Sequence, residues 1–541
     1  MGSNAALGLY FNNTGTTAFS GTGDVIQVGT DGITIAAGSG AITNPGAISS
    51  AAGGFDLMGS QTWTNNSTNT FLFNTTTVDS SVTTPITLTL AGTGSFEINK
   101  YDNIGAGAAL SLVVNGASVN VQTGQSYTGT TTIEAGSILV YNSGALGSGN
   151  IYLGNTSGSA NATLGFQGLG STTSNFTVVA GNTGTETLEL TGSGNNSTFS
   201  GAFTLNNSLT LTDTVGSGGS NVSPTMNLTG LISGSGGLNL VRTGSDQYVN
   251  VVLSGANTYT GGTTMTAGNL DIDNASAIGT GTLTLVAGTI DNTSGSAVTL
   301  ATNNTQVWNG SFSFGGTNAL NLGTGTVALG TATRTVTVNG TAPLTVGGVI
   351  SSTSSTVGLT KAGIGTLILA GINTYTGATT VSAGTLDLTG SLVSAVTVSA
   401  GAVLETTGTG TITGATTIAS TAALDFQFSS STDTANTLTF GALTLTSGAL
   451  LNLNDIAPGT VTAGTVFDVA NFSSLTGTFS NYANDSAVTI DGNTYEIQYG
   501  PSDITLTDVA SVPEPSTWAM LIGGLAALAF VVRRSSSREL V

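Results

Sequence analysis

Short runs of alternating apolar and polar residues recur along almost the whole chain. Typical runs are ITLTL at 86–90, TLTL at 282–285, TVTV at 335–338 and TLIL at 366–369. A period of two places the apolar side chains on one face of a β-strand, and Val, Ile and Thr favour that conformation. Gly, Asn, Ser and Asp separate the runs, and Gly and Asn tolerate the positive φ angles of tight corners. The pattern predicts an all-β fold, with helical periodicity only after residue 515.

A repeated segment indicates how these strands are arranged. Similar stretches run from Tyr127 to Leu139 (YTGTTTIEAGSIL), from Asn257 to Leu270 (NTYTGGTTMTAGNL) and from Asn373 to Leu386 (NTYTGATTVSAGTL). With weaker copies between them, they define a unit of roughly 30 residues, which is typical of a solenoid. One coil cannot bury its apolar face alone, so each coil stacks on the next at about 4.8 Å. We therefore expect a β-solenoid with about 20 to 30 residues per coil.

The NTYTG segment of the repeat is interpreted as a corner of the coil rather than as a ligand site. Asn and Gly would set the turn, and Tyr would pack against the neighbouring coil. Asp271 and Asp273 alternate with Ile272, so both are expected on a solvated outer face. The corner positions are Tyr127 and Gly129 in the first copy, Asn257, Tyr259 and Gly261 in the second, and Asn373, Tyr375 and Gly377 in the third.

Composition excludes several kinds of chemistry. The 541 residues include 79 Gly, 27 acidic and only 7 basic residues, a net charge of -20. Before the last nine positions the basic residues are Lys100, Arg242, Arg334 and Lys361, too few to neutralise a nucleic-acid backbone. Cys and His are absent, which removes thiolate and imidazole catalysis and the usual zinc sites. Gly-rich calcium repeats are also missing, so we expect no metal, no cofactor and no catalytic residue.

The C-terminal stretch VPEPSTWAMLIGGLAALAFVVRR, from Val512 to Arg534, differs from the rest of the chain. Val512, Pro513, Glu514 and Pro515 form an extended segment, because proline disfavours helix at the preceding residue. The apolar segment after it has 15 residues, short against the roughly 17 to 25 of a stable span, which indicates a transient stop. Its anchoring side chains are Trp518, Leu521, Leu525, Leu528, Phe530 and Val532, and Arg533 and Arg534 would stay on the cytoplasmic side.

Two resemblances give these patterns a context. The run LTKAGIGTLILAGINTYTGATTVSAGTL from Leu359 to Leu386 resembles the autotransporter-associated β-strand repeat, and Arg242 takes the basic position in the copy that starts at Gly237. This resemblance implies a right-handed parallel β-helix (a β-solenoid). The tail is similar to the PEP-CTERM sorting signal, which implies processing by an exosortase of a Gram-negative bacterium. The alternatives for the tail are an ordinary single-span anchor or a packed C-terminal helix.

The expected organisation has four parts. These are N-terminal solenoid coils at 1–120, a solenoid with the repeats at 121–440, closing layers or a cap at 441–510, and the sorting tail with a short apolar helix at 511–541. The first eleven residues lack the basic and apolar regions of a signal peptide, so we expect a processed or miscalled start.

The leading functional hypothesis is a non-enzymatic, exported, structural or adhesin-like protein. It would lie on the cell surface, on the outer membrane or in the extracellular matrix of a biofilm, after transient anchoring in the inner membrane. Its expected partners are the exosortase and exopolysaccharides or other surface glycans, contacted weakly along the solenoid.

Two alternatives remain. One is an ice- or surface-binding β-solenoid, although the Thr rows at 75–77 and 130–132 do not recur at one fixed coil length. The other is a polysaccharide-active β-helix enzyme that uses a carboxylate pair such as Asp271 with Asp387.

Overall fold

The computed structural model shows a chain built almost entirely of β-strands. It divides into two compact units, Met1–Leu386 with Leu392–Ser394, and Asp387–Ser391 with Ala395–Val541. In the part of the chain that the structure describes, the coils number about 16. The residues that the structure describes are 5–18, 25–43, 54–73, 76–79, 81–99, 109–142, 144–167, 171–192, 196–214, 224–242, 250–462, 464–509 and 520–529.

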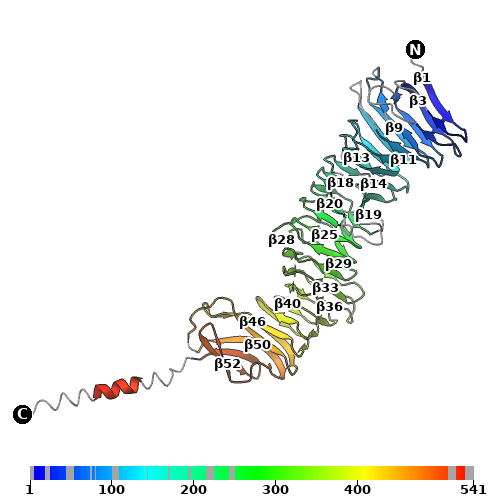
Figure 1. The fold of residues 1–541 in the computed structure, drawn as a ribbon. Coiled ribbons are helices and arrows are strands. Elements are labelled where there is room, and N and C mark those ends of the chain that lie inside the picture. The colour runs from blue at the N-terminus through cyan, green and yellow to red at the C-terminus, as the bar shows by residue number, and fades with distance from the viewer. Residues whose placement is uncertain are drawn as a thin grey trace, which may run out of the picture. The chain divides into compact units, whose positions relative to one another are not determined.

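In the first unit, strands from successive coils pair in parallel. Figure 1 shows them stacked one after another from β1 (Ala5–Phe11) onward. A 23-stranded sheet lies entirely in this unit. Its central strands are β10 (Ser95–Ile98), β11 (Leu110–Val121), β12 (Thr131–Val140), β13 (Ile151–Leu153), β14 (Ala162–Phe166), β15 (Phe176–Val178), β16 (Glu186–Leu190), β18 (Phe203–Leu205), β19 (Leu209–Asp213), β21 (Ile232–Gly234), β22 (Leu238–Leu240), β24 (Thr263–Met265), β26 (Leu283–Leu285) and β29 (Gln306–Trp308).

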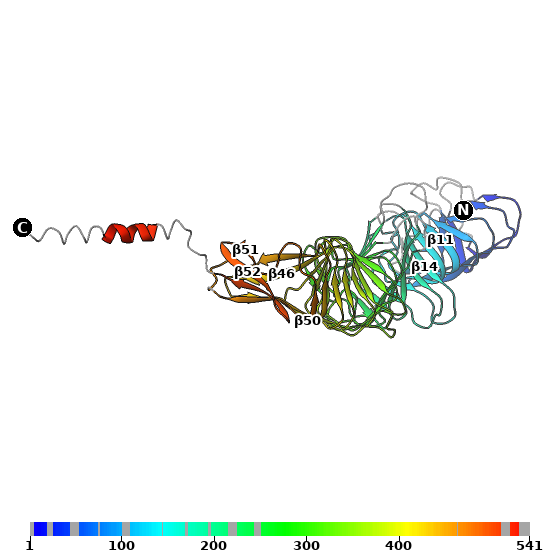
Figure 2. The same ribbon diagram turned by 90° about the horizontal axis from the view of Figure 1, so that it is seen from below.

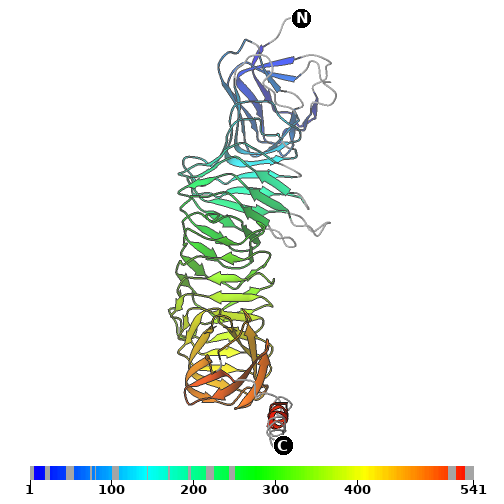
Figure 3. The ribbon, with the colours of Figure 1, turned by 90° about the vertical axis from the view of Figure 1, so that its left-hand side faces the viewer.

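Other parallel strands of this unit form a second face of the coils. In Figure 3 the cyan to green part of the chain shows the strands as stacked arrows. The strands of the second face include β17 (Asn196–Phe199), β20 (Thr225–Leu228), β23 (Asn250–Leu253), β25 (Asn269–Ile272), β27 (Thr289–Asp291), β30 (Phe312–Phe314), β33 (Arg334–Val338), β36 (Leu359–Ala362) and β39 (Thr379–Val381).

The length of the coils varies from one to the next. Leu112 pairs with Thr131, whereas Ile33 of β3 (Val25–Ile35) pairs with Trp63, which is a longer step along the chain. The strands stay in register because the corners between them contain different numbers of residues. The predicted β-solenoid is therefore confirmed.

The core of the first unit consists of inward-pointing apolar side chains stacked in ladders. One ladder continues through seven paired strands from β14 to β29, and each of its side chains is at most 1% exposed. Burying one such side chain contributes about 2 kcal/mol relative to leaving it in water. The members are Leu164, Leu188, Leu211, Leu240, Met265, Leu285 and Trp308.

An aromatic cluster fills the core of the early coils. Phe55, Trp63 and Phe71 come from β5 (Gly54–Leu57), β6 (Gln61–Asn65) and β7 (Phe71–Phe73), with ring centroids 5.1 to 6.0 Å apart. The indole Nε1 of Trp63 donates a hydrogen bond of 2.8 Å to Gln61 Oε1, which satisfies its buried polar atom. In these coils the aromatic rings therefore pack together with buried aliphatic side chains such as Leu57 and Leu88.

The second unit begins with parallel coils and ends in an antiparallel layer. Strand β50 pairs in parallel with β48 and antiparallel with β53, and β52 pairs antiparallel with β53 and β51. Figure 2 shows β46, β50, β51 and β52 together in this unit. The strands of this unit include β42 (Val396–Val398), β43 (Val403–Glu405), β44 (Thr409–Ile412), β45 (Thr416–Ile418), β46 (Ala423–Ser429), β47 (Thr434–Ala435), β48 (Thr437–Leu445), β49 (Leu450–Asp455), β50 (Val466–Thr476), β51 (Ser486–Ile490), β52 (Asn493–Tyr499) and β53 (Asp503–Asp508).

A short helix at 520–529 follows in the C-terminal tail. Leu521, Leu525 and Leu528 lie on it and are 57 to 65% exposed. Among the described residues, no helix has both the length and the apolar character needed to cross a membrane.

Candidate functional site

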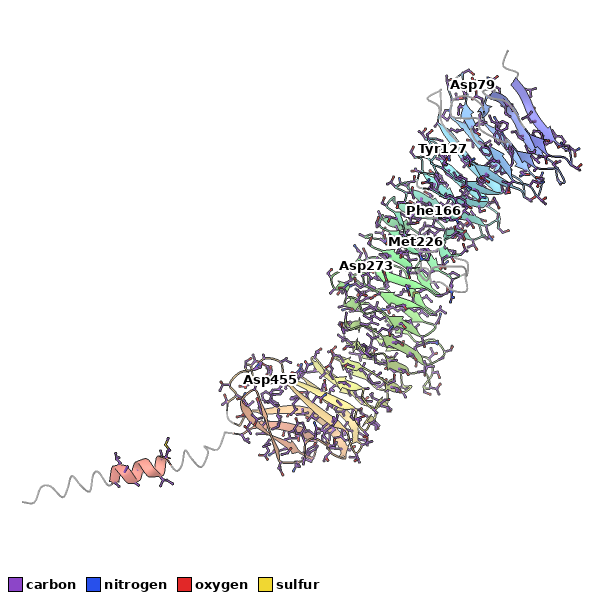
Figure 4. All side chains as sticks on the ribbon, in the orientation of Figure 1. Asp79, Tyr127, Phe166, Met226, Asp273 and Asp455 are labelled. Atoms are coloured by element: carbon purple, nitrogen blue, oxygen red, sulfur yellow. The ribbon has the colours of Figure 1, made fainter. Side chains whose placement is uncertain are left out.

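The tyrosines of the repeated corner are completely enclosed. Tyr127, Tyr259 and Tyr375 are at most 1% exposed, and Figure 4 labels Tyr127 in its coil. Each phenol shares a hydrogen bond with the threonine four residues later, with O–O distances of 2.5 Å to Thr263 and 2.7 Å to Thr379 in the second and third copies. Burial raises the pKa of all three phenols, that of Tyr375 to about 12. These side chains stabilise a corner and are not accessible to a ligand.

The asparagines of the corner connect neighbouring coils. Asn257 accepts a hydrogen bond from the Ile232 backbone N–H at 2.8 Å and donates one to the Ala277 carbonyl at 2.6 Å. Asn373 accepts from the Ile350 N–H at 3.0 Å and donates to the Gly371 carbonyl at 3.0 Å. Both side chains therefore replace backbone ladder bonds where the strand turns.

The glycines of the corner lie against the backbone of the preceding coil. A Cβ at Gly129 would be 2.4 Å from the Leu110 carbonyl oxygen, and one at Gly377 would be 2.3 Å from the Val357 carbonyl carbon. Gly261 meets backbone at 2.4 Å in the same way. Any side chain at these positions would separate the two coils.

Two basic residues of the body, Lys361 and Arg334, also serve the fold. Lys361 is fully buried, and its Nζ donates hydrogen bonds to the carbonyls of Ala362, Gly363 and Ala383 at 2.9, 2.9 and 3.0 Å. Burial lowers the pKa of Lys361 to about 8. Arg334 donates from Nε to two backbone carbonyls at 2.8 Å. Of the other two, Arg242 lies beside a surface groove, and Lys100 lies outside the described residues.

A long column of hydroxyl groups covers the outer side of the 23-stranded sheet. Its members are successive register partners on strands β10 to β26, and each is partly or fully exposed. Eight of the nine residues are Ser or Thr, so the column presents one polar side chain per coil at about 4.8 Å. They are Ser95, Ser118, Ser137, Thr163, Thr187, Thr210, Asn239, Thr264 and Thr284.

A polar groove follows the second face of the first unit. Its floor is a column of register partners, and two adjoining hollows of about 620 and 370 Å³ lie along it. Asn269 Nδ2 donates a hydrogen bond of 2.6 Å to Asn250 Oδ1, which joins two coils in an amide ladder. The floor residues are Asn250, Asn269, Thr289, Ser313 and Thr337.

Two carboxylates, Asp271 and Asp291, border this groove, and Asp273 lies next to them. Asp271 and Asp273 both accept hydrogen bonds from the Thr293 hydroxyl, at 3.2 and 2.9 Å, and Asp291 is the register partner of Asp271. Asp273 is labelled in Figure 4. Burial, with the charges of Asp273 and Asp291, raises the pKa of Asp271 to about 6. No cluster of acidic side chains suited to a metal ion occurs in the described part of the chain.

Asp387, the other carboxylate considered for a hydrolase pair, lies on β40 (Thr385–Leu388). It is buried and accepts hydrogen bonds from the backbone N–H and the hydroxyl of Thr407 at 3.0 and 2.8 Å. Its charged neighbour is Glu405, whereas the neighbours of Asp271 are Asp273 and Asp291. Asp271 and Asp387 therefore have different charged neighbours and different hydrogen-bond donors.

The processing residues of the tail fall mainly outside the described residues. This holds for Val512, Pro513, Glu514 and Pro515, and likewise for Trp518, Phe530, Val532, Arg533 and Arg534. Sequence reasoning missed one partly exposed aromatic residue on the solenoid, Tyr152 of β13. The alternation of Tyr152 with the buried Ile151 and Leu153 was the signal that could have identified it.

Comparison with known families agrees with both resemblances. The passenger-associated transport repeat matches residues 122–140, 250–272 and 359–388, and the PEP-CTERM protein-sorting motif matches 511–535. The chain carries passenger-associated transport repeats and a PEP-CTERM protein-sorting motif. A search of curated proteins found the adhesin BmaC autotransporter of Brucella suis biovar 1 (strain 1330), 31% identical over 305 residues. This match covers 54% of the chain but only 7% of that adhesin.

Proposed function

We propose that the chain is an exported, surface-associated, adhesin-like protein without enzymatic activity. The sorting motif at 511–535, on the same chain as three passenger-associated transport repeats, is the observation that carries this proposal. The solenoid would present columns of hydroxyl and amide groups to extracellular glycans, including those of a biofilm matrix. Many weak contacts along such a surface add to a strong attachment.

The tail would direct the chain to an exosortase. Sorting would hold the chain briefly at the inner membrane through the apolar segment around 518–532 and then cleave it near Pro513 to Pro515. The Pro-Glu-Pro sequence supports this role because proline disfavours helix at the preceding residue, and an extended segment suits a processing enzyme.

The carboxylates of the solenoid support a binding role over hydrolysis. Asp271, Asp273 and Asp387 each accept hydrogen bonds from threonine side chains, which hold them in the walls of the coils. Besides Asp271 and Asp291, the groove is lined by amides and hydroxyls, which suit hydrogen bonding to a hydroxylated polymer.

The column of hydroxyl groups favours a second candidate function, binding to ice or another ordered surface. Its residues remain in register although the coils differ in length, so the irregular spacing in the sequence does not break the column. A Thr187→Val and Thr210→Val double variant tests this candidate. Loss of ice-recrystallisation inhibition relative to the unmodified chain would support ice binding, and absence of inhibition by the unmodified chain would exclude it.

The test of the leading proposal is the intact mass and the C-terminal peptide of the protein recovered from its native host. A chain on the surface or in the culture fluid that ends near Pro513 to Pro515 is expected. A variant with Ala in place of Pro513, Glu514 and Pro515 should retain its tail. An intact tail on the unmodified chain in the membrane fraction would contradict exosortase processing, and loss of adhesion on gene deletion would test the adhesin role separately.

A further inference from the structure

A groove on the first unit surrounds the outward-facing ring of Tyr152. It has a volume of about 480 Å³, within the range of small-molecule sites. Thr132, Tyr152 and Thr177 form its floor as register partners on β12, β13 and β15. We call it the Tyr152 groove; its other lining residues include Glu134, Asn155 and Asn206.

Tyr152 differs from the tyrosines of the repeated corner. Those phenols are buried and bonded to threonine, whereas the ring of Tyr152 is partly exposed. Within the part of the chain that the structure describes, the Tyr152 hydroxyl has no hydrogen-bond partner. The ring therefore contributes neither to the core nor to a corner, and its face and hydroxyl are available to a ligand.

Polar groups with unused hydrogen-bonding capacity surround this ring. Asn206 is exposed, and its side-chain amide bonds to no other described residue. Asn155 accepts a hydrogen bond of 2.7 Å from the Thr156 N–H, which leaves its amide NH₂ free to donate. Glu134 accepts one from Asn115 at 2.9 Å, so the carboxylate is held at the side of the groove.

A glycine, Gly154, also lines the groove. Gly154 follows Tyr152 by two residues at the end of β13, where its φ of +93° is unfavourable for other residues. The matching positions in the coils on either side are occupied by side chains, among them Glu134 and Val179. A Cβ at Gly154 would lie 2.7 Å from Oε1 of the buried Glu186, so the absence of a side chain there leaves room for that carboxylate.

The lining fits a neutral, hydroxylated partner. Among the described residues, no Lys or Arg lines the groove, and the chain has a net charge of -20, so anionic polymers are repelled. The backbone of β13 is paired on both sides, with β12 and β15, and so offers no free edge to an extended peptide. The paired strands β12 to β18 span about 14 Å at 4.8 Å per strand, which accommodates several units of a linear polymer.

We propose that the Tyr152 groove binds a hexose unit of a neutral, extended polysaccharide. The ring of Tyr152 stacks on the apolar face of the sugar, and Asn155 and Asn206 bond to its hydroxyl groups. This inference rests on the proposed adhesin-like function and assigns it a partner class and a site.

The experiment measures binding of the full chain to a β-1,4-glucan, a β-1,3-glucan, an α-1,4-glucan, a mannan and a galactan by affinity electrophoresis. A polyuronate and an extended peptide serve as competitors of other classes. We expect binding to at least one neutral polysaccharide. Tyr152→Ala should weaken it about tenfold, as expected for loss of a stacked aromatic contact, and Tyr152→Phe should keep it within about threefold.

The matched control is Tyr141→Ala, which removes a partly exposed tyrosine that does not line the groove. It should bind like the unmodified chain. Asn206→Ala provides a second test should Tyr152→Ala fail to fold, because the exposed Asn206 amide bonds to no other described residue. Binding only to the polyuronate or the peptide, no binding to any neutral polysaccharide, or equal binding by Tyr152→Ala or Asn206→Ala would overturn the proposal. Surface location and tail cleavage of the native protein are measured independently, so the groove can fail while the proposed function stands.

Discussion

The phenol of Tyr375 shares a hydrogen bond of 2.7 Å with the hydroxyl of Thr379, and neither side chain is more than 1% exposed. Thr379 also contacts the Ser394 hydroxyl at 2.7 Å, which extends the bond into a short chain of buried hydroxyls. The same Tyr–Thr pair occurs at Tyr127 and Tyr259. The repeated motif therefore encodes a corner of the solenoid in which a Tyr and a Thr hydroxyl are buried and hydrogen-bonded to each other.

Replacing Tyr375 by Phe should therefore destabilise its coil. Loss of one buried hydrogen bond costs about 0.5–1.5 kcal/mol, and the ring still fills its space. Because solenoids open locally, hydrogen exchange of amides in the 350–381 coils is the appropriate measurement. Tyr152→Phe is the matched control, since its hydroxyl has no partner among the described residues, and it should leave exchange unchanged. Equal exchange in the two variants would contradict a stabilising role for the corner bond.

Gly377→Ala should lower the stability of the fold, although it adds only one methyl group. The new methyl group would lie 2.3 Å from a backbone carbon of Val357, and backbone cannot move aside without separating the coils. Overpacking of this kind typically costs about 1–3 kcal/mol. Gly408→Ala is the control, because the nearest atom would be 3.8 Å away. Urea unfolding of both variants should show a loss only for Gly377→Ala, and a similar midpoint for the two would refute the close approach.

The buried ammonium of Lys361 is expected to be essential to its turn. In Lys361→Met three backbone carbonyls lose their donor, which should cost about 2–4 kcal/mol even though the apolar stem is retained. Ile364→Met, at a position 76% exposed three residues later, should change stability by less than about 0.5 kcal/mol. Thermal unfolding monitored by circular dichroism separates the two. Unchanged stability of Lys361→Met would show that water replaces the ammonium.

The strands and corners could be predicted from the sequence because they depend on local patterns. The runs around 86–90 and 335–338 lie within β9 (Ile86–Ala91) and β33 as expected. The register between coils could not be predicted, because it depends on how many residues each corner contains. Thr163, Thr187 and Thr210 share one column although the two steps between them differ in length along the chain.

The candidate site was less accessible to sequence reasoning. Asp271 and Asp273 were correctly placed on an outer face, yet their neighbour Asp291 belongs to the next coil and is adjacent to Asp271 only through strand pairing. Tyr152 resembles any other strand aromatic until its neighbours Gly154 and Asn206 are placed around it. Such sites form between coils, so their residues share no motif in the sequence.

Mild acidification should stabilise the second unit. Burial, together with the charges of Asp387 and Asp425, raises the pKa of Glu405 from 4.5 to about 7. Between these pH values the folded chain retains a proton that the unfolded chain has released, so the free energy of unfolding falls as the pH rises from 4.5 to 7. Above pH 7 the whole of this destabilisation is present, and below pH 4.5 it is absent.

Glu405→Gln should remove this part of the pH dependence, because the neutral amide fits the same position without a charge. Asp468→Asn, at an exposed position of β50, should leave it intact. Urea unfolding at pH 5 and pH 7.5 should give a smaller difference in midpoint for Glu405→Gln than for the unmodified chain or the control. If all three chains show the same difference, the charge repulsion between Asp387, Glu405 and Asp425 does not limit the stability of these coils.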